Sequence, residues 1–145
     1  MSEVKLTKIA VIGSGSWGTA LANLLAEKEG IDVDLWAREE AVYKEIRVKH
    51  TNQLFLPDVQ LAPALKPVSS FENALYEKQL VLIAAPSHVF REVLMGLKPH
   101  LTSGMTLMIA TKGIENDSLM IMSEVVQAVL GPRFLTHFAC LAGPS

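Results

Sequence analysis

A glycine-rich turn between an apolar segment and a helical pattern is the feature that most constrains the fold of this chain. The segment Ile9–Ile12 runs directly into Gly13-Ser14-Gly15-Ser16-Trp17-Gly18, and a helix-forming run follows at once. In a strand–turn–helix unit, Gly13 permits the tight turn, Gly15 lets an anion approach the backbone, and Gly18 lets the helix lie close to the sheet. Free N–H groups at the helix start favour a pyrophosphate there. The motif predicts a dinucleotide site, with an ordinary turn packed through small residues as the alternative.

The rest of the sequence alternates short apolar segments with longer helical patterns. Most of the apolar segments lack polar alternation, which is typical of strands buried on both faces. The predicted strands are Ile9–Ile12, Val33–Trp36, Leu80–Ala84, Leu107–Ala110 and Phe138–Leu141, with a weaker candidate near Val68. The predicted helices are Ser16–Glu29, Glu39–His50, Phe71–Tyr76, His88–Leu97 and Ser118–Leu130. This alternation predicts an α/β fold, a Rossmann-like doubly wound and mainly parallel sheet with helices on both faces.

Three segments define the remaining organisation. The last helix has a start signal at Asn116-Asp117-Ser118 and a stop signal at Gly131-Pro132. Thr51–Pro67 carries three prolines and no clear period, which predicts a long irregular loop of a kind that is often functional. The chain ends directly after a predicted strand. We therefore expect residues 1–145 to be one NAD(P)-binding domain cut from a longer protein, with a substrate domain beyond residue 145.

The end of the second predicted strand bears on which dinucleotide is bound. An NAD-specific site normally places a carboxylate there, on the ribose hydroxyls. This sequence has Arg38 instead, and a guanidinium suits a 2′-phosphate. Glu39 and Glu40 follow and could also bind ribose hydroxyls. NADP(H) is therefore favoured and NAD(H) stays open, and a solvated Arg38 at the start of the next helix is the alternative.

Three other predicted strand ends carry small or polar residues, namely Ala85–His88, Thr111–Glu115 and Gly143–Ser145. Ligands of open parallel sheets bind outside the carboxyl ends of the strands, so these turns should face the same crevice as the glycine loop. Lys112 is a cation that a buried strand delivers to that edge, with a solvated loop lysine as the alternative. We expect Ser87 and His88 to cap the following helix. The histidines have no ligand-like spacing with Cys or carboxylate pairs, so no metal site is predicted.

Composition argues against several classes of function. A formal net charge of −2 gives no electrostatic footprint for nucleic acid or an acidic membrane. The longest apolar run, Leu80–Pro86, is too short to span a bilayer, and the N-terminus lacks a signal-peptide pattern. Cys140 is the single cysteine, and its apolar neighbours predict a buried structural thiol rather than a reactive one. A cytoplasmic domain without nucleic-acid or membrane partners is expected.

Six short motifs, in this order and at this spacing, resemble one family of enzymes. They are GSGSWGTALA at Gly13–Ala22, LWAR at Leu35–Arg38, NQLFLP at Asn52–Pro57, APSH at Ala85–His88, TKGIE at Thr111–Glu115 and AGPS at Ala142–Ser145. Together they resemble the NAD(P)-dependent glycerol-3-phosphate dehydrogenases over essentially the whole chain. Six ordered motifs are far more specific than the glycine loop alone.

The resemblance implies a set of site residues. It implies that Ser16 and Trp17 lie along the pyrophosphate and nicotinamide ribose, that Arg38 lies at the adenosine 2′ position, and that Phe55 lies near the cofactor. Lys112 would contact both cofactor and substrate. Gly143 and Ser145 would line the glycerol phosphate site.

The resemblance also implies the reaction and a division of labour. Similar enzymes move a hydride between NAD(P)H and dihydroxyacetone phosphate or sn-glycerol 3-phosphate, supplying glycerol phosphate for phospholipid synthesis. Their general acid–base lysine belongs to a helical second domain, so no catalytic residue is expected in this chain, and the chain alone is expected to be inactive. The alternatives are a stand-alone dinucleotide-binding or redox-sensing module, or another two-domain dehydrogenase acting on a 2-hydroxy acid or hydroxyacyl thioester. A homodimer of the longer parent also stays open.

Overall fold

The structure is built around a single parallel sheet. The computed structural model describes residues 3–134 and 136–142. The strands are β1 (Lys8–Ile12), β2 (Asp32–Trp36), β3 (Lys66–Val68), β4 (Leu80–Ile83), β5 (Thr106–Ile109) and β6 (Phe138–Cys140). The α-helices are α1 (Ser16–Ala26), α2 (Glu40–Lys49), α3 (Phe71–Leu75), α4 (Phe90–Leu97) and α5 (Met122–Leu130). Short 3-10 turns lie at η1 (Ser87–Val89), η2 (Lys98–His100) and η3 (Pro132–Phe134).

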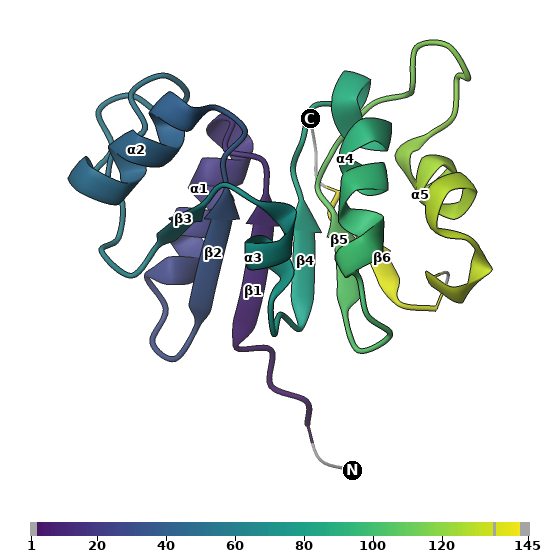
Figure 1. The fold of residues 1–145 in the computed structure, drawn as a ribbon, viewed down its shortest axis with the longest axis horizontal. Helices are drawn as coiled ribbons and strands as arrows, with labels where there is room; N and C mark the ends of the chain where they lie inside the picture. The colour runs from purple at the N-terminus through teal and green to yellow at the C-terminus, as the bar shows by residue number, and fades with distance from the viewer. Residues whose placement is uncertain (1–2, 135, 143–145) are drawn as a thin grey trace.

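The order of the strands confirms the predicted fold class. The six-stranded sheet runs β3-β2-β1-β4-β5-β6, and every neighbouring pair is parallel. This is the order of two mononucleotide-binding halves, in which the chain reverses its direction across the sheet between β1 and β4. Figure 1 shows the strands pointing toward the same edge, with α3 and α4 in front of the sheet and α1 behind it. Ligands of such folds bind at that edge, beside the reversal.

Alternate residues of the central strands face two separate cores. On β1, Ile9 and Val11 pack with α1 and α2, whereas Ala10 and Ile12 pack with α3, α4 and α5. This two-residue period follows from the strand geometry. All four residues of β4 are buried, so its continuous apolar run reflects burial on both faces. The helices therefore cover both faces, as predicted.

The predicted start of the last helix at Ser118 is wrong. The helix α5 begins at Met122, and the Ser118 hydroxyl donates to the Glu115 carboxylate and accepts from the Met120 N–H instead of capping a helix. The Glu124 carboxylate accepts a hydrogen bond from the Ile121 N–H (2.9 Å) and so completes the first turn. Serine readily bonds nearby backbone in turns as well as at helix starts, so the signal was ambiguous. The stop at Gly131 (φ 81°) is confirmed.

The predicted burial of Cys140 is also wrong, because this residue is exposed. Strand β6 lies at the edge of the sheet and pairs with β5. Little of this edge strand is buried, since Ala139 is exposed as well. The apolar composition of this segment identified a strand but did not reveal that it would lie at an edge.

The remaining segments agree with expectation in type, but α1 ends at Ala26 rather than Glu29, and α4 begins at Phe90 rather than His88 because a 3-10 turn precedes it. Residues 51–65 contain no helix or ladder strand, as predicted for the irregular loop, although the end of the predicted range forms β3. Leu61 and Leu65 of this loop are each 1% exposed and anchor it in the core beneath α1 and α2. Among the helices of the described residues, none has both the length and the apolar character needed to traverse a bilayer.

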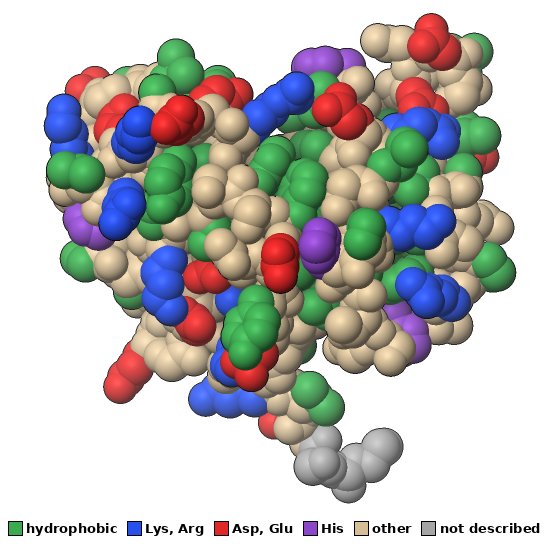
Figure 2. All heavy atoms as spheres, viewed as in Figure 1, with side chains coloured by type: hydrophobic (Ala, Val, Ile, Leu, Met, Phe, Trp, Pro, Cys, Tyr) green, Lys and Arg blue, Asp and Glu red, His purple; other side chains and the backbone are tan. Residues whose placement is uncertain are grey.

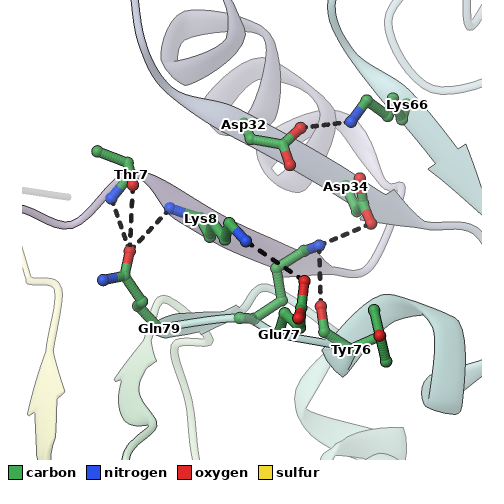
Figure 3. A network of polar contacts seen from close by, with 9 residues as sticks. Thr7, Lys8, Asp32, Asp34, Lys66, Tyr76, Glu77 and Gln79 are labelled. Carbon is green, nitrogen blue, oxygen red and sulfur yellow. Dashed lines mark hydrogen bonds and ion pairs between the residues drawn. The ribbon is translucent and has the colours of Figure 1, made fainter.

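A buried ion pair lies near the opposite, amino edge of the sheet. Lys78 Nζ is 2.9 Å from Asp34 Oδ2, and the two side chains are 6% and 11% exposed. Lys78 also donates to the Tyr76 carbonyl (3.4 Å). Figure 3 shows the surrounding network, in which the Lys66 ammonium meets Asp32 at 2.5 Å in a far more exposed position. The two charges can be buried here because each compensates the other.

Removing the Lys78 charge should therefore destabilise the fold strongly. We expect Lys78→Met, which keeps most of the apolar stem, to lower the free energy of unfolding by about 3–5 kcal/mol, because Asp34 becomes an uncompensated buried charge. The double variant Lys78→Met/Asp34→Asn should lose clearly less. The matched control Lys66→Met breaks the exposed pair and should cost about 1 kcal/mol or less. Urea unfolding at pH 7 measures all three, and equal losses for the two single variants would contradict the prediction.

Candidate functional site

The turn after β1 has a backbone that only glycine accommodates well. Gly13 adopts φ +115°, and a Cβ at this position would lie 3.0 Å from the Ala84 carbonyl carbon. The Gly13 N–H donates to the Trp36 carbonyl (3.2 Å). The turn is thus fixed between the carboxyl ends of β2 and β4.

Gly18 and Gly15 serve opposite purposes. A Cβ on Gly18 would lie 1.9 Å from the Gly13 carbonyl oxygen, so Gly18 sets how closely α1 approaches the turn. A Cβ on Gly15 would meet nothing within 4 Å. Gly15 is the N-cap residue of α1, with no side-chain capping hydrogen bond and no acidic residue in the first turn. The helix start is therefore open, and its N–H groups and dipole favour an anion.

Asn52 fastens the irregular loop to the glycine turn, and sequence reasoning missed it. Its side chain is fully buried, and Nδ2 donates to the Ser14 carbonyl (2.9 Å) and to Thr19 Oγ1 (2.9 Å). Asn52 Oδ1 accepts from the Phe55 N–H (3.3 Å), and the Ser16 hydroxyl donates to the Phe55 carbonyl. The contacts that reach the turn from this loop join residues more than 30 positions apart, so no local pattern predicts them. They place Phe55 beside the turn.

One cleft opens on the β2 side of the turn. This β2-side cleft has a volume of about 240 Å³ and brings together Gly13, Gly15, Arg38 and Phe55, which the sequence predicted as site residues. Ser14, Glu39 and His88 also line it. The Ser14 hydroxyl is buried and has no hydrogen-bond partner among the described residues.

A second cleft opens on the β5 side. This β5-side cleft has a volume of about 460 Å³ and is lined by Trp17, Ser87, Thr111 and Lys112, together with Ala85 and Pro86. Ala85 and Pro86 line both clefts, so the two adjoin at the turn after β4. Figure 2 shows the upper edge of the molecule hollowed between its two halves. An elongated ligand could cross the turn from one cleft to the other.

Acidic side chains flank Arg38 at the mouth of the β2-side cleft. Arg38 Nη2 lies 4.0 Å from Glu92 Oε1, and the two side chains are 55% and 75% exposed. Glu39 lies next to Arg38 and lines the same cleft. The guanidinium is therefore accessible and only loosely paired. Sequence reasoning found Arg38 and Glu39 but not Glu92, which comes from α4.

A bidentate ion pair joins the segments that follow β4 and β5. Arg91 Nε and Nη2 lie 2.6 Å and 2.8 Å from Glu115 Oε1 and Oε2. The Arg91 hydrogen bonds, with a further one from Ser118, lower the pKa of Glu115 from an ordinary value of 4.5 to about 2. Glu115 is thus ionised at neutral pH.

The expectation that Ser87 and His88 cap a helix is wrong. Neither the η1 turn nor α4 has a side-chain capping hydrogen bond. Ser87 lines the β5-side cleft and His88 the β2-side cleft. Gly143 and Ser145, the remaining predicted site residues, lie outside the described residues. Within the described parts of the chain, no three His, Cys, Asp or Glu side chains lie close enough together to hold a metal ion.

Comparison with known proteins identifies the family. Residues 8–145 match the family described as NAD-dependent glycerol-3-phosphate dehydrogenase N-terminus. This chain belongs to that family.

The relatives in this dehydrogenase family are longer than the chain. The protein of Geobacter sulfurreducens named glycerol-3-phosphate dehydrogenase (NAD(P)+) is 50% identical over 138 residues, which cover 95% of this chain and 41% of that protein. A crystal structure of glycerol-3-phosphate dehydrogenase from Coxiella burnetii superposes with a TM-score of 0.80 at 34% identity, covering 88% of this chain and 38% of the other. The yeast glycerol-3-phosphate dehydrogenase structure, at 24% identity and a TM-score of 0.78, shares the fold. The chain thus spans about two fifths of the length of these proteins.

The glycine turn, both clefts and Lys112 all lie within the residues that match the glycerol-3-phosphate dehydrogenase family. The structure brings the described predicted site residues to the carboxyl edge of the sheet. It divides them between the two clefts, with Gly13, Gly15, Arg38 and Phe55 on one side and Trp17 and Lys112 on the other. Gly18 and Ser16 hold the turn between them.

Proposed function

We propose that this chain binds NAD(P)(H) across the glycine turn and that its longer parent transfers a hydride between NAD(P)H and dihydroxyacetone phosphate or sn-glycerol 3-phosphate. The observation that carries the proposal is the open space at Gly15, over the uncapped start of α1 and between two adjoining clefts. The names of the relatives support the cofactor and the substrate pair. The proposal includes a supply of glycerol phosphate for phospholipid synthesis in the cytoplasm.

The residues present fit a dinucleotide. A pyrophosphate would lie over Gly15, where α1 offers N–H groups and no side chain intrudes. The adenosine half would occupy the β2-side cleft beside Arg38 and Phe55, and the nicotinamide half the β5-side cleft beside Trp17 and Lys112. When bound, the nicotinamide ring supplies the hydride donor or acceptor. Lys112 would hold cofactor and substrate by charge, with Gly143 and Ser145 on the substrate side.

The proposal assigns the acid–base step to a second, helical domain beyond residue 145, in the part of the relatives that this chain does not cover. In this chain, Lys112 supplies the positive charge at the β5-side cleft. This chain would then bind and orient the cofactor, and the longer protein would complete the substrate pocket and exclude water.

We also propose a preference for NADP(H) through Arg38. The exposed guanidinium at the mouth of the β2-side cleft suits a 2′-phosphate. Glu92 and Glu39 oppose this preference, because each carboxylate attracts the guanidinium and would repel the phosphate. Glu39 could accept a hydrogen bond from a ribose hydroxyl of NAD(H), so the same site accommodates both cofactors.

Substitutions at Gly15 and Gly18 should separate binding from folding. We expect Gly15→Val to abolish detectable binding of NADPH and NADH, because the side chain fills the pyrophosphate position, while the melting temperature stays near that of the unaltered chain. Gly18→Ala should instead destabilise the fold, since its Cβ would lie 1.9 Å from backbone oxygen. Titration calorimetry and thermal unfolding give both readouts. Unchanged cofactor binding by Gly15→Val would contradict the proposed site.

Arg38→Ala should lower the affinity for NADPH roughly 10- to 150-fold and leave the affinity for NADH nearly unchanged. This range corresponds to losing a hydrogen bond to a charged group, about 1.5–3 kcal/mol. Arg47→Ala on α2 is the matched control for loss of a positive charge and should leave both affinities unchanged. An unaltered chain that binds NADH more tightly than NADPH would contradict the preference.

The division of labour can be tested with a chimera that joins this chain to the remaining part of the Geobacter sulfurreducens relative. We expect the chimera to oxidise NADPH with dihydroxyacetone phosphate, and the present chain alone to turn over negligibly. General acid–base catalysis contributes roughly 10²–10⁴-fold, and substrate positioning up to about 7–11 kcal/mol. The chimera carrying Gly15→Val is the control and should be inactive. Comparable rates for the chain and the chimera would show that the chemistry resides in these residues.

A further inference from the structure

The ion pair Arg91–Glu115 joins two segments that each contribute residues to the β5-side cleft, Ser87 near one end of the pair and Lys112 near the other. Arg91 lies in the first turn of α4, shortly after the turn that follows β4, and Glu115 lies in the segment that follows β5. The two side chains are 37% and 18% exposed, and both guanidinium contacts are shorter than 3 Å. Paired nitrogen and oxygen atoms fix the relative orientation of the two groups as well as their distance. The pair therefore ties together two segments that border one cleft.

Glu115 is also the centre of the loop that it belongs to. Its N–H donates to the Met120 carbonyl (2.8 Å), and its carbonyl accepts from the Leu119 N–H (2.9 Å). Its carboxylate accepts from the Ser118 hydroxyl. An isolated antiparallel bridge between Ile114 and Ile121 closes the loop. Because these contacts converge on one residue, Glu115 transmits the position of α4 to the whole loop.

The segment that carries Lys112 is held to the rest of the fold on both sides of this residue. On one side, the Thr111 hydroxyl donates to the Ala85 carbonyl (2.7 Å). On the other side, Glu115 holds Arg91. Gly113, between Lys112 and Glu115, has φ +115°, which turns the backbone sharply beside Ser87. Lys112 itself is exposed and lines the cleft, so the backbone on either side of it determines where its ammonium group can reach.

We propose that Arg91 and Glu115 are positioning residues, which hold Lys112 at the β5-side cleft and so determine how tightly the nicotinamide half of the cofactor is bound. This inference rests on the proposed function, since it takes the β5-side cleft as the nicotinamide site. The hydrogen bonds from Arg91 and Ser118 lower the pKa of Glu115 to about 2, so the pair stays charged well below neutral pH. A purely structural pair would stabilise the fold without discriminating between the two halves of the cofactor.

The test compares a whole cofactor with its adenosine half. Affinities for NADPH and for adenosine 2′,5′-bisphosphate are measured by calorimetry on the present chain and on Lys112→Ala, Glu115→Gln and their double variant. We expect each single substitution to weaken NADPH binding by roughly 3- to 10-fold, the range for loss of one ordinary hydrogen bond, because Lys112 is exposed. Binding of the bisphosphate should not change. The double variant should bind no more weakly than Lys112→Ala, because coupled residues are not additive.

Matched variants control for stability. Glu124→Ala removes a contact to the Ile121 backbone in the same region and should lower stability without changing NADPH affinity. Arg91→Lys keeps the charge but loses the bidentate geometry, so it should reproduce the selective loss of NADPH affinity even if Glu115→Gln folds poorly. The exchanged pair Arg91→Glu/Glu115→Arg should recover part of that loss.

Each contrary outcome would contradict a different part of the inference. Lower stability with unchanged NADPH affinity in Glu115→Gln and Arg91→Lys would show that the pair is structural only. Additive losses in the double variant would show that Glu115 does not act through Lys112. Equal losses for NADPH and the bisphosphate would overturn the assignment to the nicotinamide half. An unaltered chain that binds NADPH no more tightly than the bisphosphate would overturn this inference alone. A chain that binds none of NADPH, NADH and the bisphosphate would overturn the proposed function with it.

Discussion

The close approach of α1 to the carboxyl ends of β1 and β4 is the constraint on which the site depends. It exists because Gly18 presents a hydrogen where any other residue would place a Cβ 1.9 Å from the Gly13 carbonyl oxygen. With α1 in this position, its first N–H groups lie at the reversal point of the sheet, and the clefts on either side share the turn after β4. A helix displaced outward by one side chain would move Gly15 away from the β2-side cleft that it lines.

The buried ion pair at the amino edge and the start of α1 at the carboxyl edge differ in their electrostatics. At the amino edge, charged side chains compensate one another, and the Lys78–Asp34 pair does so in a buried position. At the carboxyl edge, the first turn of α1 contains no acidic residue and the N-cap residue makes no side-chain hydrogen bond. The positive end of α1 is thus left for a ligand. A fold that stabilises itself at one edge can leave polar groups uncompensated at the other, where binding can compensate them.

Sequence reasoning succeeded where the determining physics is local. Runs such as Leu80–Ile83 are apolar because both faces of the strand are buried, and each glycine of the turn has a requirement that can be read from its place between strand and helix. It failed where one local pattern permits several contacts, or where the outcome depends on distant partners. Ser118 lost its expected capping role because Glu115 competes for its hydroxyl, and Cys140 is exposed because β6 lies at an edge that its own residues do not specify. Asn52 and the Arg91–Glu115 pair join segments that no motif links, so the fold had to be known before they could be recognised.

Cofactor preference cannot be predicted from one residue when the site is assembled from several strand ends. Arg38 follows β2, whereas Glu92 belongs to α4 after β4, and their side chains lie 4.0 Å apart although β1 separates the two strands. An exposed pair of this kind contributes about 1 kcal/mol or less, so a 2′-phosphate can displace Glu92 from Arg38 at small cost. In the proposed site without that phosphate, the guanidinium would stay beside Glu92, and Glu39 would be free to accept from ribose hydroxyls. In the proposed site, a weak pair between the residues that follow β2 and β4 would let one cleft accept either dinucleotide, where a single fixed carboxylate or a fully unopposed arginine would select one of them.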